Sequence, residues 1–173
     1  MKRIVLCGLV SVILGVFIAG CEPGQKPAKV SQTVVKKYAK ATVLQGTVSN
    51  DNGVIKVGIV KATDENDHFI AQGAVDNGHY SVEIPANTIL PILLKFSSAS
   101  STDKFVAAVV HDTITKYEIN PLTTAIAAAA KAMGGYTHAN MIRAAEAGVH
   151  VPDANKTVTG WRGDPTTQYG GWH

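Results

Sequence analysis

Residues 76–85 read DNGHYSVEIP and carry a strong signal of β structure. Asn77 and Gly78 form the residue pair most typical of a tight β-turn, because both tolerate the positive φ that a type I′ turn requires. The residues that follow, YSVEI at 80–84, alternate between apolar and polar. A period of two predicts a strand with one face on a core. The stretch therefore predicts a β-hairpin.

Further segments with the same period lie on both sides of this hairpin. Together with it they give about seven short strands spaced by roughly ten residues, which is typical of a sandwich or barrel. The candidate strands are residues 44–48, 55–61, 68–75, 79–84, 92–96, 105–110 and 113–119. In the second of them we expect Ile55, Val57 and Ile59 to face the core. Short links favour antiparallel pairing, so residues 42–119 are expected to form an antiparallel β-sandwich.

After the last candidate strand the period becomes helical. Asn120 can cap a helix and Pro121 fits its first position, while the glycine pair at 134–135 can end it. A second short helix is expected over residues 138–147. The fold class is therefore mainly β, with two short α-helices over residues 120–148 packed on the sandwich.

The N-terminal residues predict a targeting signal. Lys2 and Arg3 precede a short apolar run that closes on the sequence IAGC at 18–21. A charged start, an apolar centre and small residues at the end are typical of a secretory signal peptide, and the run is short for a membrane span. The segment resembles a bacterial lipoprotein signal with its lipobox. This resemblance implies that residues 1–20 are removed, and that Cys21 carries a diacylglycerol thioether and an N-acyl chain such as palmitate.

The composition limits the remaining chain. Lys2 and Arg3 account for two of the 16 basic residues, so 14 basic residues remain against 13 acidic ones. Such a near-neutral chain lacks the strong positive electrostatic potential that is typical of nucleic-acid-binding proteins. Cys7 lies in the signal, so Cys21 is the one cysteine left, and neither a disulfide nor a thiolate metal site is expected.

Two polar segments flank the expected domain. Residues 21–41 contain two prolines and five lysines, and we expect a flexible, lipid-anchored tether that is either attracted to anionic headgroups or simply solvated. Residues 149–173 are rich in turn-forming residues and are expected to form a polar tail with aromatic side chains.

The β segment resembles a known family. The sequence GTV at 46–48, the hairpin at 76–85, the strand around Leu94 and the sequence INPLTT at 119–124 are similar to carboxypeptidase regulatory-like, or transthyretin-like (prealbumin-like), domains. One departure is that residues 52–57 are shorter than the family's insert after the first strand. The resemblance implies a non-catalytic module, so no catalytic residues are transferred.

Few residues suggest chemistry. Among the six histidines, His111 followed by Asp112 after a buried strand is the best candidate for a metal ligand or an acid–base group, although a polar turn at the end of the strand is the favoured interpretation. The acidic residues at 64–67 lack the glycine and distal glutamate of a calcium loop, which favours a solvated loop. Four aromatic residues in the C-terminal part of the chain either form a glycan-binding surface or cover the helices. They are Tyr136, Trp161, Tyr169 and Trp172.

These observations favour a lipid-anchored envelope lipoprotein that is not an enzyme and mediates protein–protein interaction at the membrane surface. By analogy with the sorting of bacterial lipoproteins, Glu22 after Cys21 implies the outer membrane rather than the inner one, facing the periplasm or the cell surface. The expected partners are the membrane, through the anchor, and an envelope protein or a second copy. No cofactor is expected besides the covalent lipid. Two alternatives are a filament or surface-layer subunit assembled by β-strand addition, and a histidine-based metal-binding protein.

Overall fold

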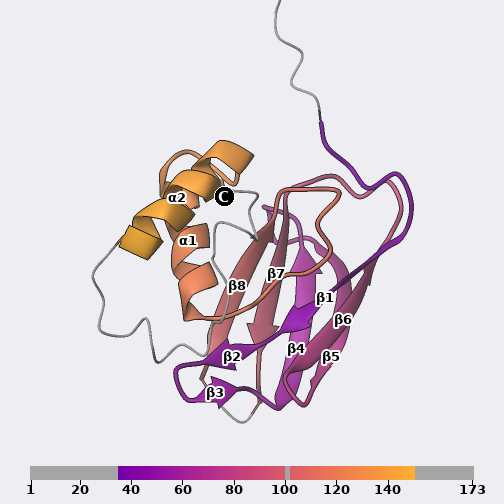
Figure 1. Ribbon diagram of the computed structural model, residues 1–173. Helices are drawn as coiled ribbons and strands as arrows, with labels where there is room; N and C mark the ends of the chain where they lie inside the picture. The colour runs from indigo at the N-terminus through magenta and orange to yellow at the C-terminus, as the bar shows by residue number, and fades with distance from the viewer. Residues whose placement is uncertain (1–34, 100–101, 151–173) are drawn as a thin grey trace, which may run out of the picture. The chain divides into compact units, whose positions relative to one another are not determined.

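One antiparallel sheet of six strands forms most of the fold, with the strand order β1-β6-β5-β4-β7-β8 (Figure 1). The structure is a computed structural model that describes residues 35–99 and 102–150. The strands of the large sheet are β1 (Thr42–Thr47), β4 (Val57–Thr63), β5 (Phe69–Asp76), β6 (His79–Ile84), β7 (Ile92–Ser97) and β8 (Lys104–Val109). A small hairpin comprises β2 (Ser49–Asn50) and β3 (Gly53–Val54), and the two helices are α1 (Pro121–Ala132) and α2 (His138–His150).

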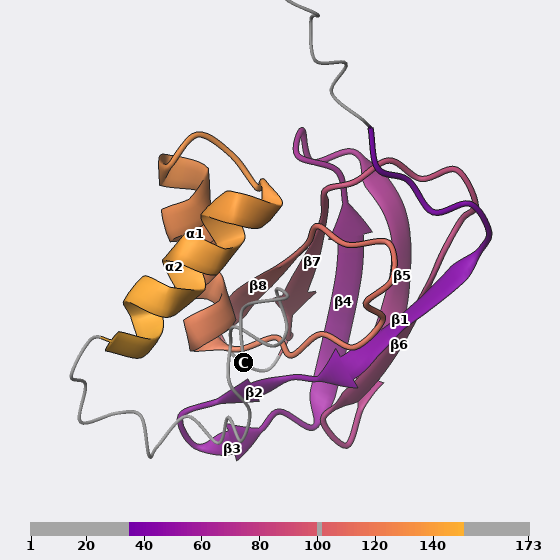
Figure 2. The same cartoon turned by 45° about the horizontal axis from the view of Figure 1, so that its top comes forward.

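The prediction of a mainly β fold with antiparallel strands and two short helices is confirmed. The sandwich and the count of seven strands are not confirmed. The large sheet curls around one core, and α1 packs against β8 with α2 packed on α1 (Figure 2). Apolar residues of the sheet, α1 and α2 therefore share a single core, without a second large sheet among the described residues.

The hairpin at 76–85 forms as predicted. Asn77 and Gly78 adopt φ values of 49° and 87°, and Val75 pairs with Tyr80 across the turn. The three apolar residues of β6 are buried. A Cβ at position 78 would lie 2.8 Å from the Cβ of Val54, so the turn also needs glycine for space.

The predicted facing of the strand at residues 55–61, which the structure describes as β4, is wrong. Val57 and Ile59 are 69% and 41% exposed, whereas Val60 and Ala62 of β4 are fully buried. The physical reason is an interruption between two strands. β3 ends at Val54 and β4 begins at Val57, so the alternation of residues 55–59 does not run through one strand. Of the three residues expected inside, Ile55 alone packs against the core.

The segment 113–119, predicted as a strand, forms single parallel bridges with Gln45 of β1 and with Val48, which directly follows β1. The Gln45 N–H donates to the Thr115 carbonyl, and the Tyr117 N–H donates to the Gln45 carbonyl, both at 2.9 Å. The close approach requires Gly46, because a Cβ there would lie 1.9 Å from the Tyr117 carbonyl oxygen. The segment thus covers the outer edge of β1.

The start of α1 is capped as predicted. The Asn120 side chain accepts a hydrogen bond from the Thr123 N–H at 2.9 Å, and the Thr123 hydroxyl accepts one from the Asn120 N–H. The same turn also covers the edge of β8, since the Val106 N–H donates to the Thr124 hydroxyl at 2.9 Å. The Thr123 hydroxyl in turn donates to the Val106 carbonyl at 3.0 Å. α2 runs on to His150, past the predicted end at residue 147.

The end of the predicted tether belongs to the fold, which corrects the boundary at residue 41. Tyr38 is 2% exposed, and its N–H donates to the Thr88 carbonyl at 3.0 Å. Lys37 forms an antiparallel bridge with Ile89. The lysine-rich composition conceals this, because one buried aromatic side chain and a few backbone hydrogen bonds are sufficient to fix the segment. The rest of the predicted tether, the predicted signal at 1–20 and residues 151–173 of the predicted tail lie outside the described residues.

Candidate functional site

Two histidines from distant parts of the chain meet beside the core. His111 Nε2 and His138 Nδ1 lie 2.7 Å apart, and the ring planes are nearly perpendicular at 86°. Both side chains are half-buried. At this distance the nitrogens share a hydrogen bond, in which one imidazole donates and the other accepts. We call these two residues the histidine pair.

Rigid elements position both members of the pair. His111 follows directly after β8 and the buried Val110, and its carbonyl accepts a hydrogen bond from the Tyr38 hydroxyl at 3.2 Å. His138 is the first residue of α2, whose start is capped by the Thr137 hydroxyl through the Asn140 N–H at 3.2 Å. The pair therefore joins the end of the sheet to the start of the second helix.

The surroundings of the pair disfavour positive charge on the imidazoles. Burial lowers the pKa of His111, and the nearby charges of Lys36 and His138 lower it further, while Asp112 opposes them. Burial and the Lys36 charge also lower the pKa of His138. Burial and the Asp112 charge raise the pKa of Tyr38 to about 12. At neutral pH the site thus holds two neutral imidazoles beside a neutral phenol.

In the structure the side chain that contacts His111 is not that of Asp112, the partner predicted from the sequence. Asp112 is exposed, and it influences the site through its charge. Among the described residues, no group of three or more histidine, cysteine, aspartate or glutamate side chains is placed to hold a metal ion. The histidine that contacts His111 is His138, which is 27 residues further along the chain. Its position at the start of the predicted helix over residues 138–147 was visible in the sequence, but the contact depends on how α2 docks.

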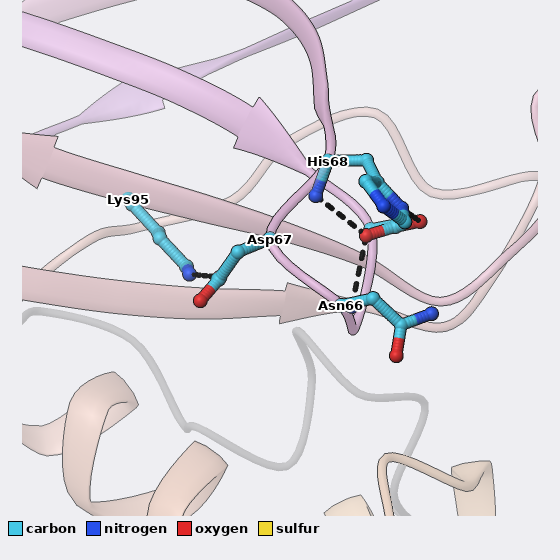
Figure 3. A network of polar contacts seen from close by, with 5 residues as sticks. Asn66, Asp67, His68 and Lys95 are labelled. Carbon is cyan, nitrogen blue, oxygen red and sulfur yellow. Dashed lines mark hydrogen bonds and ion pairs between the residues drawn. The ribbon is translucent and has the colours of Figure 1, made fainter.

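The acidic loop between β4 and β5 is held by its own hydrogen bonds (Figure 3). The Asp64 carboxylate accepts hydrogen bonds at 2.8 Å from the N–H groups of Asn66 and His68, and its other oxygen contacts His68 Nδ1 at 2.7 Å. Asp67 forms an ion pair with Lys95 of β7. The hydrogen bond from His68 and the Lys95 contact lower the pKa of Asp64 and Asp67, respectively. The carboxylates therefore stabilise the loop, in line with the expected solvated turn.

Of the remaining predicted site residues, the structure describes Tyr136 alone. Tyr136 is half-buried against the core, and burial and the charges of Glu65 and Asp67 raise its pKa. Cys21, Trp161, Tyr169 and Trp172 lie outside the described residues. In the part of the chain that the structure describes, neither helix has the length and apolar character needed to cross a membrane.

Comparison with known proteins adds no assignment. No family model, no curated protein and no solved structure matches the chain.

Proposed function

We propose that the protein is a lipid-anchored envelope lipoprotein, which acts as a non-catalytic binding or structural module at the membrane surface. The observation that carries the proposal is the short distance along the chain between the lipobox cysteine and the fold. Sixteen residues separate Cys21 from Tyr38, which is buried in the core. Even fully extended, the chain from Cys21 to Tyr38 spans at most about 60 Å. Tyr38, where the described fold begins, must then lie within this distance of a lipid attached to Cys21.

Positive charge at the start of the fold also supports a position of the domain at the membrane surface. Lys36, Lys37 and Lys40 are exposed where the chain enters the domain. A lysine close to an anionic leaflet contributes about 1 kcal/mol to association. The exposed lysines thus add to the anchor rather than replace it. The finer fold assignment, a transthyretin-like sandwich, stays part of this proposal, and its support is the hairpin sequence at 76–85 together with the sequence INPLTT at 119–124.

Association through side-chain surfaces is favoured over strand addition. Strand addition needs an edge with unpaired N–H and C=O groups. On β1, Gln45 is bonded to the segment that covers this edge, and on β8 both backbone groups of Val106 are bonded to threonine hydroxyls of α1. A new strand would have to displace these contacts.

Metabolic labelling with an alkynyl fatty acid in bacterial cells tests the anchor. The wild-type chain should be labelled and found in membranes, and Cys21→Ser should lose both properties. Cys7→Ser provides the matched control, because it removes the other cysteine and should change neither. Labelling that survives in Cys21→Ser would overturn the proposal. Crosslinking of the labelled wild type in intact cells should then recover an envelope protein or a second copy.

A further inference from the structure

We propose that His111 and His138 form a two-histidine site for a divalent transition metal of the Cu(II)–Ni(II) class. The two imidazole nitrogens bind the ion in adjacent positions of a square, and solvent fills the rest. This site is independent of the lipid anchor and of the proposed module function.

The separation of the nitrogens is closer to that of two ligands at a right angle than to that of two ligands of a tetrahedron. With metal–nitrogen bonds of 2.0–2.1 Å, two ligands at a right angle lie about 2.9 Å apart, whereas two ligands of a tetrahedron lie about 3.3 Å apart. The nitrogens of His111 and His138 are 2.7 Å apart. A small outward movement therefore gives the square arrangement, which Cu(II) and Ni(II) prefer with nitrogen ligands.

The orientation of the rings agrees with this reading. In a collinear N–H···N bond of this length the ring centroids would lie roughly 5 Å apart, because each ring extends directly away from the other. The observed centroids are 4.3 Å apart. The rings are thus tilted away from the collinear arrangement, as two ligands of one ion at a right angle would also be.

The protonation state of the pair is compatible with binding. A neutral imidazole offers a lone pair on one nitrogen and carries its proton on the other. In the hydrogen-bonded pair one proton lies between His111 Nε2 and His138 Nδ1. Binding moves this proton, through solvent, to the other nitrogen of the same ring. Both facing nitrogens then offer a lone pair to the ion, without net proton release.

The charges around the site set its strength. Lys36 lies close enough to act on both histidines, and the start of α2 carries the positive end of the helix dipole. Asp112 acts in the opposite direction on His111. We expect these charges to make the site weaker than one built from three or four protein ligands. Lys36→Gln should accordingly tighten metal binding.

Titration of the untagged full-length protein in detergent with Cu(II) alone, followed by calorimetry and electron paramagnetic resonance, tests the site. The wild-type spectrum should show coupling to two imidazole nitrogens. His111→Gln and His138→Gln should each lose one of these couplings and bind at least tenfold more weakly. His79→Gln, which alters an exposed histidine on β6, should match the wild type.

Two results would overturn the site. One is a double variant, His111→Gln with His138→Gln, that binds Cu(II) as the wild type does. The other is measured on the wild type alone, so it does not depend on folding of the variants. Bound Cu(II) should broaden the ring NMR signals of His111 and His138 before those of His68 and His79, and broadening that begins at any other histidine contradicts the proposal.

Discussion

The hydroxyl of Tyr38 donates a hydrogen bond to the backbone carbonyl of His111, and the two oxygens lie 3.2 Å apart. This contact joins the first residues of the fold to the turn after β8. It therefore connects the segment that leads from Cys21 with the turn that carries one member of the histidine pair.

Tyr38→Phe should reduce the free energy of unfolding at neutral pH by about 1 kcal/mol, because it removes the donor and leaves the His111 carbonyl without this partner. Chemical denaturation monitored by circular dichroism measures the change. The ring itself stays, so Tyr38→Ala should cost several times more through lost burial. Equal stability of the phenylalanine variant and the wild type would show that the bond contributes nothing.

Tyr38 also predicts a loss of stability in alkali. Its pKa is raised from 10.0 to about 12 by burial and the Asp112 charge. Between these values the folded chain keeps the proton that the unfolded chain releases, so stability falls as the pH rises through this window. Unfolding curves from pH 9 to 12, compared with Tyr38→Phe, should show a flatter dependence in the variant. Parallel curves would contradict the assignment.

Asn120→Ala should destabilise the protein by about 1 kcal/mol, because the side-chain oxygen caps α1 through the Thr123 N–H. Asn120→Ser keeps a capping oxygen and removes the Asn120 Nδ2 donor, which is buried without a hydrogen-bond partner in the described part of the chain. The serine variant should therefore unfold at a higher denaturant concentration than the alanine variant. The reverse order would mean that the cap is not the stabilising contact.

Gly46→Ala and Gly148→Ala should change stability in opposite directions. At position 46 the added Cβ would meet the Tyr117 carbonyl at 1.9 Å, and the backbone shift should cost about 1–3 kcal/mol. At position 148 the Cβ would lie 3.5 Å from Leu122 Cδ1, an ordinary contact, and alanine in a helix gains about 0.5–1 kcal/mol over glycine. Thermal unfolding of both variants measures the difference. A harmless alanine at 46 would refute the close pairing of segment 113–119 with β1.

Thr124→Val should expose the edge of β8, because the Val106 N–H loses its acceptor. Hydrogen exchange at the Val106 amide should become faster, whereas Thr124→Ser, which keeps the hydroxyl, should retain the protection. Free edges also promote association between chains. Size-exclusion chromatography should show more self-association for the valine variant, and unchanged exchange in that variant would indicate that α1 does not cover the edge.

Val60→Ala and Val57→Ala test the corrected facing of β4. Val60 is fully buried and Val57 is 69% exposed. The first variant should lose about 2 kcal/mol of stability, and the second should stay within about 0.5 kcal/mol of the wild type. Denaturant titration of the two variants side by side decides the facing. A larger loss for Val57→Ala would restore the facing expected from the sequence.

The sequence predicted the features that depend on neighbouring residues. The Asn77–Gly78 turn and the Asn120 cap are correct because backbone conformation and capping are local properties. The facing of β4 was missed because a break at 55–56 shifts the alternation, and composition does not reveal such a break.

Contacts between distant segments were beyond the sequence pattern. Tyr38 lies in a lysine-rich stretch, and its burial depends on pairing with the residues around Thr88. His138 was not singled out, because its contact with His111 exists only after α2 docks. A short docking segment or a two-residue site leaves no periodic signal, and both needed the structure.

The intact mass of the protein extracted from bacterial membranes shows whether Cys21 is the first residue and carries lipid. We expect a chain that begins at Cys21 and carries the added mass of a diacylglycerol and one N-acyl chain. An unmodified chain that retains residues 1–20, or one cleaved at another position, would contradict it.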